Sequence, residues 1–217
     1  MSVRREVFQH LLAHYGPQGW WPAQTPFEVM VGAILTQNAA WTNVERAIER
    51  LKEEGALDPQ VLAGVEPTRL GEWIRPAGYF NVKARRLQAF CRWYLAQGEW
   101  EALSRWETEP LRRALLAVHG VGPETADDIL LYAFERPVFV IDAYTRRLFS
   151  RLGLVSAEWD YERLRAWFED GLEPDPALFN EYHALIVRHA KVHCRVRPRC
   201  TACPLQPRCP QGRLSRS

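Results

Sequence analysis

Two glycines one residue apart, Gly120 and Gly122, separate two apolar helical stripes and constrain this chain more than any other feature. The stripes consist of Leu111, Leu115, Leu116 and Val118 before the glycines, and of Ala126, Ile129, Leu130 and Ala133 after them. Glycine permits backbone angles that a side chain resists, and Pro123 suits a first helical position. The pattern predicts a helical hairpin whose second helix begins with outward-pointing N–H groups, which can bind a phosphate without a cationic side chain. An ordinary helical hairpin is the alternative that this segment leaves open.

Helical periodicity continues through most of the chain. We expect Asn43 to cap a helix from Val44 to Glu54 that ends at Gly55. Similar apolar periodicity occurs over residues 27–35, 87–95, 164–172 and 182–192. Only Pro137–Ile141 resembles a strand, and we interpret it as a buried connector that leads to Asp142. The sequence therefore predicts an all-α fold.

Composition indicates a globular protein. The chain has 217 residues, of which 47% are hydrophobic and 25% charged, enough to bury one substantial core or two small ones. Charged residues interrupt the first positions, where a signal peptide would need an apolar run, and no apolar stretch approaches membrane-spanning length. We expect a cytoplasmic, nucleoid-associated protein of bacterial type with no membrane partner.

Positive charge gathers at the C-terminal end, although the net charge is only +2. Residues 182–217 contain no Asp or Glu. They contain Arg188, Lys191, Arg195, Arg197, Arg199, Arg208, Arg213 and Arg216. Such a basic segment indicates a surface for nucleic acid, and a solvated basic tail is the alternative.

Four of the five cysteines lie close together, as Cys194-x5-Cys200-x2-Cys203-x5-Cys209. The fifth, Cys91, lies on an apolar helical face and is expected in the core. Four thiols so spaced in a chain from a reducing compartment favour a metal centre over disulfides. Both a zinc ion and a four-iron, four-sulfur cluster accept four thiolates, so spacing leaves the two open.

Four ordered motifs carry a family resemblance. They are Gly-Ala-Ile-Leu-Thr-Gln-Asn at 32–38, Pro-Ala-Gly-Tyr-Phe-Asn-Val-Lys-Ala at 76–84, Gly-Val-Gly-Pro-Glu-Thr-Ala-Asp at 120–127 and Asn-Glu-Tyr-His-Ala-Leu-Ile-Val at 180–187. With the cysteine quartet and Asp142, they resemble the endonuclease III group of the helix-hairpin-helix DNA glycosylases over nearly the whole chain. Within that group they look most similar to the monofunctional 3-methyladenine-type glycosylases.

The resemblance implies two helical lobes with an active cleft between them. One is a six-helix barrel over residues 26–134 that ends in the hairpin, and the other combines residues 1–25 with 135–217. In this family a cap, here about residues 194–209, usually holds a [4Fe-4S] cluster, which the resemblance favours over zinc. The family's usual first cysteine spacing is x6, so the x5 spacing here shortens a basic loop. A monovalent cation at the hairpin is a further expectation of the resemblance.

The resemblance also assigns the chemistry. Members that cut the strand carry a lysine at the position of Glu124, and a glutamate cannot form their Schiff base. Asp142 matches the catalytic aspartate, which would stabilise the cationic sugar left when the base departs and would orient the attacking water. An N-cap for a helix over 143–152 is the alternative role of Asp142.

Removal of a base requires its extrusion from the stack, and several residues match positions that assist it. Gln37 is expected to fill the vacated space and Tyr79 to act as the opposing wedge. Aromatic side chains that would line the base pocket are Trp21, Trp41 and Tyr144. Phosphate contacts are expected from Lys83, Arg195, Arg197 and Arg199, and from the hairpin residues His119, Gly120, Val121, Gly122 and Thr125. Ordinary packing or solvation is the alternative for each of these side chains.

Three functions follow from these patterns. The first is a monomeric, monofunctional glycosylase that removes a damaged base, such as 3-methyladenine, from double-stranded DNA. The second is a bifunctional glycosylase and AP lyase that uses another lysine and acts on oxidised or deaminated pyrimidines. The third is a structure-specific DNA-binding protein without catalysis, against which the presence of Asp142 argues.

Overall fold

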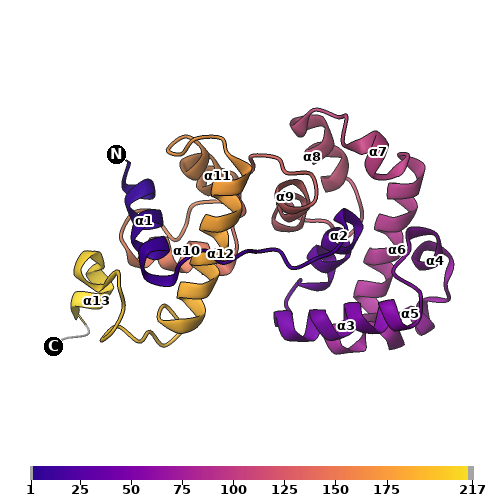
Figure 1. Cartoon of the computed structure of the whole chain (residues 1–217), viewed down its shortest axis with the longest axis horizontal. Helices are drawn as coiled ribbons and strands as arrows, with labels where there is room; N and C mark the ends of the chain where they lie inside the picture. The colour runs from indigo at the N-terminus through magenta and orange to yellow at the C-terminus, as the bar shows by residue number, and fades with distance from the viewer. Residues whose placement is uncertain (1, 215–217) are drawn as a thin grey trace. The chain divides into compact units, whose positions relative to one another are not determined.

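The computed structural model describes residues 2–214, and within that range it contains helices and no strand (Figure 1). The predicted all-α fold is confirmed, whereas Arg216 of the basic segment lies outside the described residues. The chain forms two compact units. One is Ala23–Phe134, and the other combines the chain up to Pro22 with the chain from Glu135 onward.

The Ala23–Phe134 unit is built around α2, whose residues from Glu28 onward are all buried. Its helices are α2 (Pro26–Leu35), α3 (Trp41–Glu53), α4 (Pro59–Gly64), α5 (Pro67–Trp73), α6 (Phe80–Ala96), α7 (Glu99–Leu103), α8 (Thr108–Leu116) and α9 (Pro123–Tyr132), with a 3-10 turn η1 (Arg75–Ala77). Helices α3, α6 and α9 all pack against α2. The buried carboxylate of Glu28 is neutralised by Lys52 at 2.7 Å.

The other unit packs its helices around aromatic side chains. It contains α1 (Val3–Tyr15), α10 (Ala143–Arg151), α11 (Tyr161–Glu169), α12 (Pro176–Val192) and α13 (Pro210–Leu214), with a 3-10 turn η2 (Gln206–Arg208). Helix α12 contacts both α1 and α10. The rings of Phe139 and Phe168 stack with centroids 4.1 Å apart, and Tyr182 meets both edge-on. Such burial supplies most of the favourable free energy of a small helical core.

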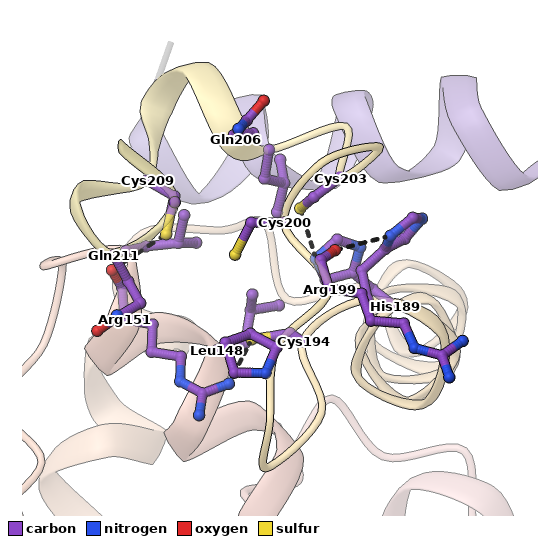
Figure 2. Close-up of a pocket in the computed structure, with 15 residues that line it drawn as sticks. Leu148, Arg151, His189, Cys194, Arg199, Cys200, Cys203, Gln206, Cys209 and Gln211 are labelled. Atoms are coloured by element: carbon purple, nitrogen blue, oxygen red, sulfur yellow. Dashed lines mark hydrogen bonds between the residues drawn. The ribbon is translucent and has the colours of Figure 1, made fainter. Parts of the chain in front are cut away.

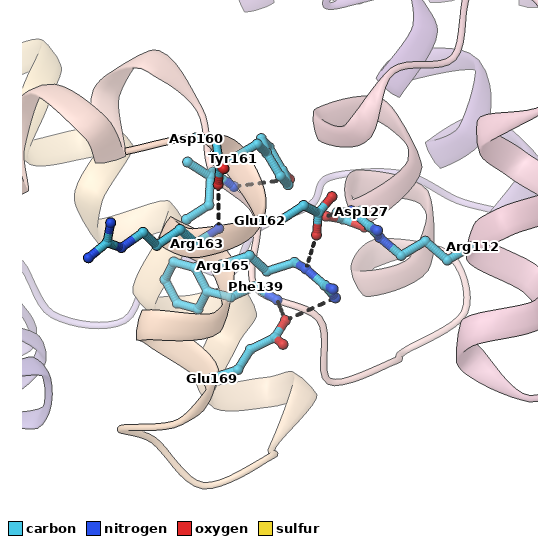
Figure 3. A network of polar contacts seen from close by, with 10 residues as sticks. Arg112, Asp127, Phe139, Asp160, Tyr161, Glu162, Arg163, Arg165 and Glu169 are labelled. Carbon is cyan, nitrogen blue, oxygen red and sulfur yellow. Dashed lines mark hydrogen bonds and ion pairs between the residues drawn. The ribbon is translucent and has the colours of Figure 1, made fainter. Parts of the chain in front are cut away.

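Hydrogen bonds and ion pairs fix the connector before Asp142 in one unit and the two hairpin helices in the other (Figure 3). The connector Pro137–Ile141 has no regular structure and is largely buried, as predicted. Within the same unit, the Phe139 N–H donates to the carboxylate of Glu169 at 2.9 Å. In the Ala23–Phe134 unit, Arg112 of α8 forms two hydrogen bonds with Asp127 of α9, at 2.7 and 3.1 Å. This buried bidentate pair fixes the two hairpin helices to each other.

Helix positions agree with the apolar periodicity, but one predicted cap is wrong. Helix α3 begins at Trp41, with Ala40 as its N-cap, so Asn43 lies inside the helix. Cys91 is fully buried, as expected, and burial raises the pKa of its thiol to about 12. No helix within residues 2–214 combines the length and apolarity needed to cross a membrane.

Candidate active site

The hairpin joins α8 to α9 through residues 117–122, and its two glycines differ. Gly120 has φ 87°, in the left-handed region that favours glycine, and a Cβ added there would overlap the side chain of Arg86. Gly122 has φ −95° and open space where a Cβ would lie. The prediction that both glycines supply special backbone angles is therefore wrong for Gly122. Its lack of a side chain instead keeps the start of α9 uncovered.

Helix α9 begins with the geometry expected of a phosphate-binding terminus. Gly122 is the N-cap and no side chain caps the helix, while Pro123 occupies the first turn. The N–H groups of a first turn have no intrahelical partner and carry the positive end of the helix dipole. Glu124, which the family resemblance places at the position of the strand-cutting lysine, is exposed in this turn.

The side chains of the hairpin divide between surface and interior. His119 is exposed, so its imidazole is available to a ligand. Val121 and Thr125 are buried, and the side chain of Thr125 accepts a hydrogen bond from Gln37 inside the unit. The contribution expected of Val121 and Thr125 to DNA contact is therefore limited to their backbone.

Gln37, predicted to fill the gap left by an extruded base, lies just after α2 with its amide turned to the hairpin. Its Nε2 donates to the Gly120 carbonyl and to Thr125 Oγ1, both at 2.9 Å, and its Oε1 accepts from Arg86. The gap-filling role stays a prediction. Filling a gap would require this amide to leave all three partners.

Tyr79, the predicted wedge, stands out on the surface of the Ala23–Phe134 unit. It caps the N-terminus of α6 in the left-handed conformation, with φ 47°. Its side chain is 70% exposed, an unusual position for an aromatic ring. Such exposure suits a wedge side chain, and the role stays a prediction.

Lys83 was expected to contact phosphate, and the structure contradicts this. Its side chain is buried, and Nζ donates to the carbonyls of Leu35 and Ala77, each at 2.7 Å. Burial, with a smaller effect of Arg86, lowers the pKa of the amine to about 8. Lys83 instead ties the end of α2 to η1.

Asp142 is the N-cap of α10, which it reaches from the buried connector. Its Oδ1 accepts a hydrogen bond from the Thr145 N–H at 2.7 Å, and its Oδ2 lies 3.4 Å from Nε2 of His183. Burial raises the pKa of this carboxyl, but His183 and Thr145 together lower it below its usual value. The carboxylate is therefore ionised at neutral pH and fixed in direction.

His183 was not identified from the sequence as a site residue. It lies on α12 and is buried among apolar neighbours. An imidazole within an apolar helical face was the signal available, but its partner, 41 positions earlier in the chain, depends on tertiary packing. His183 supports the orientation and the charge of Asp142.

The predicted base-pocket aromatics do not gather in one place within a unit. Trp21 lies in the chain segment before Pro22, whereas Trp41 begins α3 in the other unit. The Tyr144 ring on α10 is covered by the guanidinium of Arg147, 5.1 Å from its centroid. These pocket assignments stay predictions.

The four clustered cysteines all line one cavity (Figure 2). Its wall includes Leu148, Leu205 and His189. The imidazole Nε2 of His189 lies 3.6 Å from Cys203 Sγ, and its Nδ1 lies 3.0 Å from the Tyr15 hydroxyl. Within residues 2–214, no group of three or more His, Cys, Asp or Glu side chains is arranged to hold a metal ion.

A basic groove lies beside the cysteine cavity, between α10 and the loop that follows α12. It is lined by Tyr144, Arg147, Lys191, Arg195, Arg197 and Arg199. Arg147 is anchored there, since its Nε donates to the Cys194 carbonyl at 2.8 Å. The groove joins three of the predicted phosphate contacts to two cationic side chains of the neighbouring helices, which raises the local positive potential.

Comparison with known proteins gives a consistent result. Residues 31–174 match the family described as HhH-GPD superfamily base excision DNA repair protein. A protein of Methanocaldococcus jannaschii named as a DNA repair glycosylase is 46% identical over 207 residues, which cover 94% of each chain. Endonuclease III of Sulfolobus acidocaldarius is 28% identical over 185 residues, covering 84% of this chain and 81% of its own.

Solved structures agree with this assignment. The 3-methyladenine DNA glycosylase of H. pylori, bound to 1,N6-ethenoadenine, is 30% identical, with a TM-score of 0.76 over 87% of this chain and 97% of its own. Endonuclease III in a non-covalent complex with DNA shares the fold, with a TM-score of 0.84 at 20% identity over 100% of this chain and 99% of its own. The chain therefore belongs to the HhH-GPD superfamily, in its endonuclease III group, and is a base excision repair DNA glycosylase.

Proposed function

We propose that this protein is a monomeric, monofunctional glycosylase that hydrolyses the N-glycosidic bond of an alkylated purine, such as 3-methyladenine, in double-stranded DNA. The observation that carries the proposal is the state of Asp142. Its carboxylate is ionised, directed by Thr145 and His183, and retains some exposure to solvent. An acid in this state suits the stabilisation of positive charge, not the donation of a proton.

In the proposed reaction the N-glycosidic bond breaks and the base leaves with the bonding electrons. Positive charge develops on the sugar, where a fixed carboxylate stabilises it. Water then adds to C1′ while Asp142 orients it, and the released proton passes to the carboxylate or to solvent. A purine alkylated on a ring nitrogen is cationic and departs as a neutral base, so it needs no protonation by the enzyme.

Three lysines occur in the sequence, and their places support hydrolysis over a lyase reaction. Lys52 is paired with Glu28, and the Lys83 amine is enclosed between two backbone carbonyls. Lys191 lines the basic groove, and Glu124 replaces the hairpin lysine of the strand-cutting enzymes. A Schiff base requires an accessible amine, which leaves Lys191 as the lysine to test.

Alkylated purine is the substrate class that similarity supports. The H. pylori 3-methyladenine DNA glycosylase shares 30% identity over most of both chains. Exposed or half-buried aromatic side chains such as Tyr79 and Trp41 are suited to stack on a cationic base.

DNA affinity is assigned to two elements. The uncapped start of α9 would receive a backbone phosphate through its N–H groups, with Gly122 leaving room for the approach. The basic groove would contact further phosphates through Arg195, Arg197 and Arg199. Neither element reads base identity, so both would position the duplex for lesion recognition.

We infer that the four cysteines hold a [4Fe-4S] cluster. All four thiols line one cavity, and four thiolates are the ligand set that such a cluster takes. When bound, the cluster would cross-link Cys194, Cys200, Cys203 and Cys209 and so stabilise a segment that contains little regular structure.

Base release from single-lesion duplexes tests the proposed function. We expect wild type to release an alkylated purine and leave an intact abasic strand, while Asp142→Asn loses on the order of 100-fold or more in single-turnover rate. Asparagine caps helices as well as aspartate does, so α10 should be retained. Asp160→Asn, at the exposed N-cap of α11, is the matched control. Equal rates for wild type and Asp142→Asn would refute the role of Asp142.

A further inference from the structure

A chain of three side chains joins the hairpin turn to α6. Arg86 of α6 donates from Nη1 to Gln37 Oε1 at 2.5 Å, and Gln37 Nε2 in turn donates to the Gly120 carbonyl and to Thr125 Oγ1. The amide of Gln37 thus uses its oxygen toward α6 and its nitrogen toward the turn and the helix that follows it. Thr125 belongs to the first turn of α9, so Gln37 bridges Gly120 of the turn and the start of α9.

Arg86 also touches the turn directly through its hydrocarbon stem. A Cβ on Gly120 would overlap Cβ, Cγ and Cδ of Arg86, which shows that the stem packs against the bare backbone of Gly120. Gly120 is the residue of the turn in the left-handed conformation. The turn is therefore held both by the Gln37 amide and by the Arg86 stem.

We propose that Arg86 and Gln37 are positioning residues that hold the hairpin turn in the form that presents the start of α9 to a DNA phosphate. This proposal rests on the proposed function, in which that helix start binds the DNA backbone. Arg86 acts through Gln37 and Gly120 and makes no contact of its own with the phosphate. Gln37 performs this role in the free protein, before any base is extruded.

The competing account is that Arg86 is an ordinary phosphate contact, and salt dependence distinguishes the two. A cation that neutralises one phosphate contributes about 0.9 to the slope of log affinity against log salt. A positioning residue changes affinity through the geometry of neutral N–H groups and leaves that slope unchanged. The loss of affinity in the double variant also distinguishes the two. If both residues support one turn, their effects overlap in the double variant, whereas the losses of two independent contacts add.

The experiment measures the affinity of full-length protein for an undamaged duplex by fluorescence anisotropy at several salt concentrations. The variants are Arg86→Met, Gln37→Met and the double variant, with Arg92→Met as the control for loss of one positive charge on α6. We expect about tenfold weaker binding for each single variant, since each loses the charge-assisted hydrogen bond between Arg86 and Gln37. Gln37→Met also loses the hydrogen bonds to Gly120 and Thr125. The double variant should bind no more weakly than the weaker single variant, with the wild-type slope, and Arg92→Met should bind within twofold of wild type.

A second measurement needs no DNA. Amide hydrogen exchange at residues 118–126 should accelerate in Arg86→Met and in Gln37→Met, while thermal melting shows that each variant remains folded. Additive losses with a slope reduced by about 0.9 in Arg86→Met would assign a direct phosphate contact and overturn the proposal. Unchanged affinity and exchange in Arg86→Met would overturn it equally. A wild-type protein that binds no duplex would refute the proposed function instead.

Discussion

The groups that surround a buried side chain in this protein determine its charge state. Asp142 and Lys83 are both charged side chains removed from most solvent, but their environments have opposite effects. His183 and the Thr145 N–H favour the charged form of Asp142, whereas burial disfavours the charged form of Lys83. Asp142 therefore keeps the charge that the proposed chemistry requires, and Lys83 holds two carbonyl groups together.

The stability of the protein should depend on pH through Lys83. Below about pH 8 the amine is charged in both the folded and the unfolded chain, and its burial lowers the free energy of unfolding. Between about pH 8 and 10.5 the folded protein releases a proton that the unfolded chain retains, so this free energy should rise by about 3 kcal/mol. Urea denaturation from pH 7 to 10.5 should show this rise in wild type and in the exposed control Lys191→Met, but not in Lys83→Met. Equal pH slopes in wild type and Lys83→Met would contradict the burial effect.

Helices and connecting segments were predictable from the sequence where short-range patterns of apolar and capping residues determine them. The helices around the hairpin follow from apolar periodicity, and the connector before Asp142 follows from a short apolar run bounded by Pro137. The start of α3 was misplaced because Ala40, a poor capping residue, lies in an extended conformation set by the preceding turn. Contacts that join distant segments, such as those of His183 with Asp142 and Arg86 with Gly120, have no local signature.

The two hairpin glycines should respond differently to substitution. Gly120→Ala should lower the free energy of unfolding by about 1–2 kcal/mol from its left-handed backbone alone, and more from overlap with Arg86. Gly122→Ala should change it by less than about 0.5 kcal/mol, since its backbone and surroundings accept a Cβ. Its methyl group should nevertheless weaken DNA binding, which an equilibrium titration measures. Wild-type affinity in Gly122→Ala would exclude the start of α9 as a phosphate site.

The C-terminal cap should depend on its thiolates. Arg151 of α10 donates to the carbonyls of Arg195 and Val196, so hydrogen bonds fasten the loop after Cys194 to α10. Cys200→Ser should abolish visible thiolate-to-iron absorption and make the chain beyond residue 194 sensitive to limited proteolysis. Cys91→Ala, which alters the buried core thiol, should keep both the colour and the protease resistance. A colourless wild-type protein that contains zinc would contradict the cluster assignment.

At the scale of the whole molecule, the protein combines a proposed phosphate-binding helix start in the Ala23–Phe134 unit with an ionised acid and a cysteine cavity in the other unit. The family and the all-α fold were predictable because their motifs are contiguous in the sequence. Substrate choice was not, because it depends on side-chain directions in residues far apart in the chain, such as Trp21, Trp41 and Tyr144. Whether the protein can also cut the strand depends on which amines are accessible, because a Schiff base requires one.

Borohydride trapping on a duplex from which the protein releases a base tests whether hydrolysis proceeds without a lyase step. We expect complete base release, an intact abasic strand and no covalent protein–DNA adduct after reduction. At protein concentrations that saturate the duplex, Lys191→Ala should release the base at the wild-type rate. A borohydride-dependent adduct in wild type would refute monofunctional hydrolysis, and its loss in Lys191→Ala would identify the amine responsible.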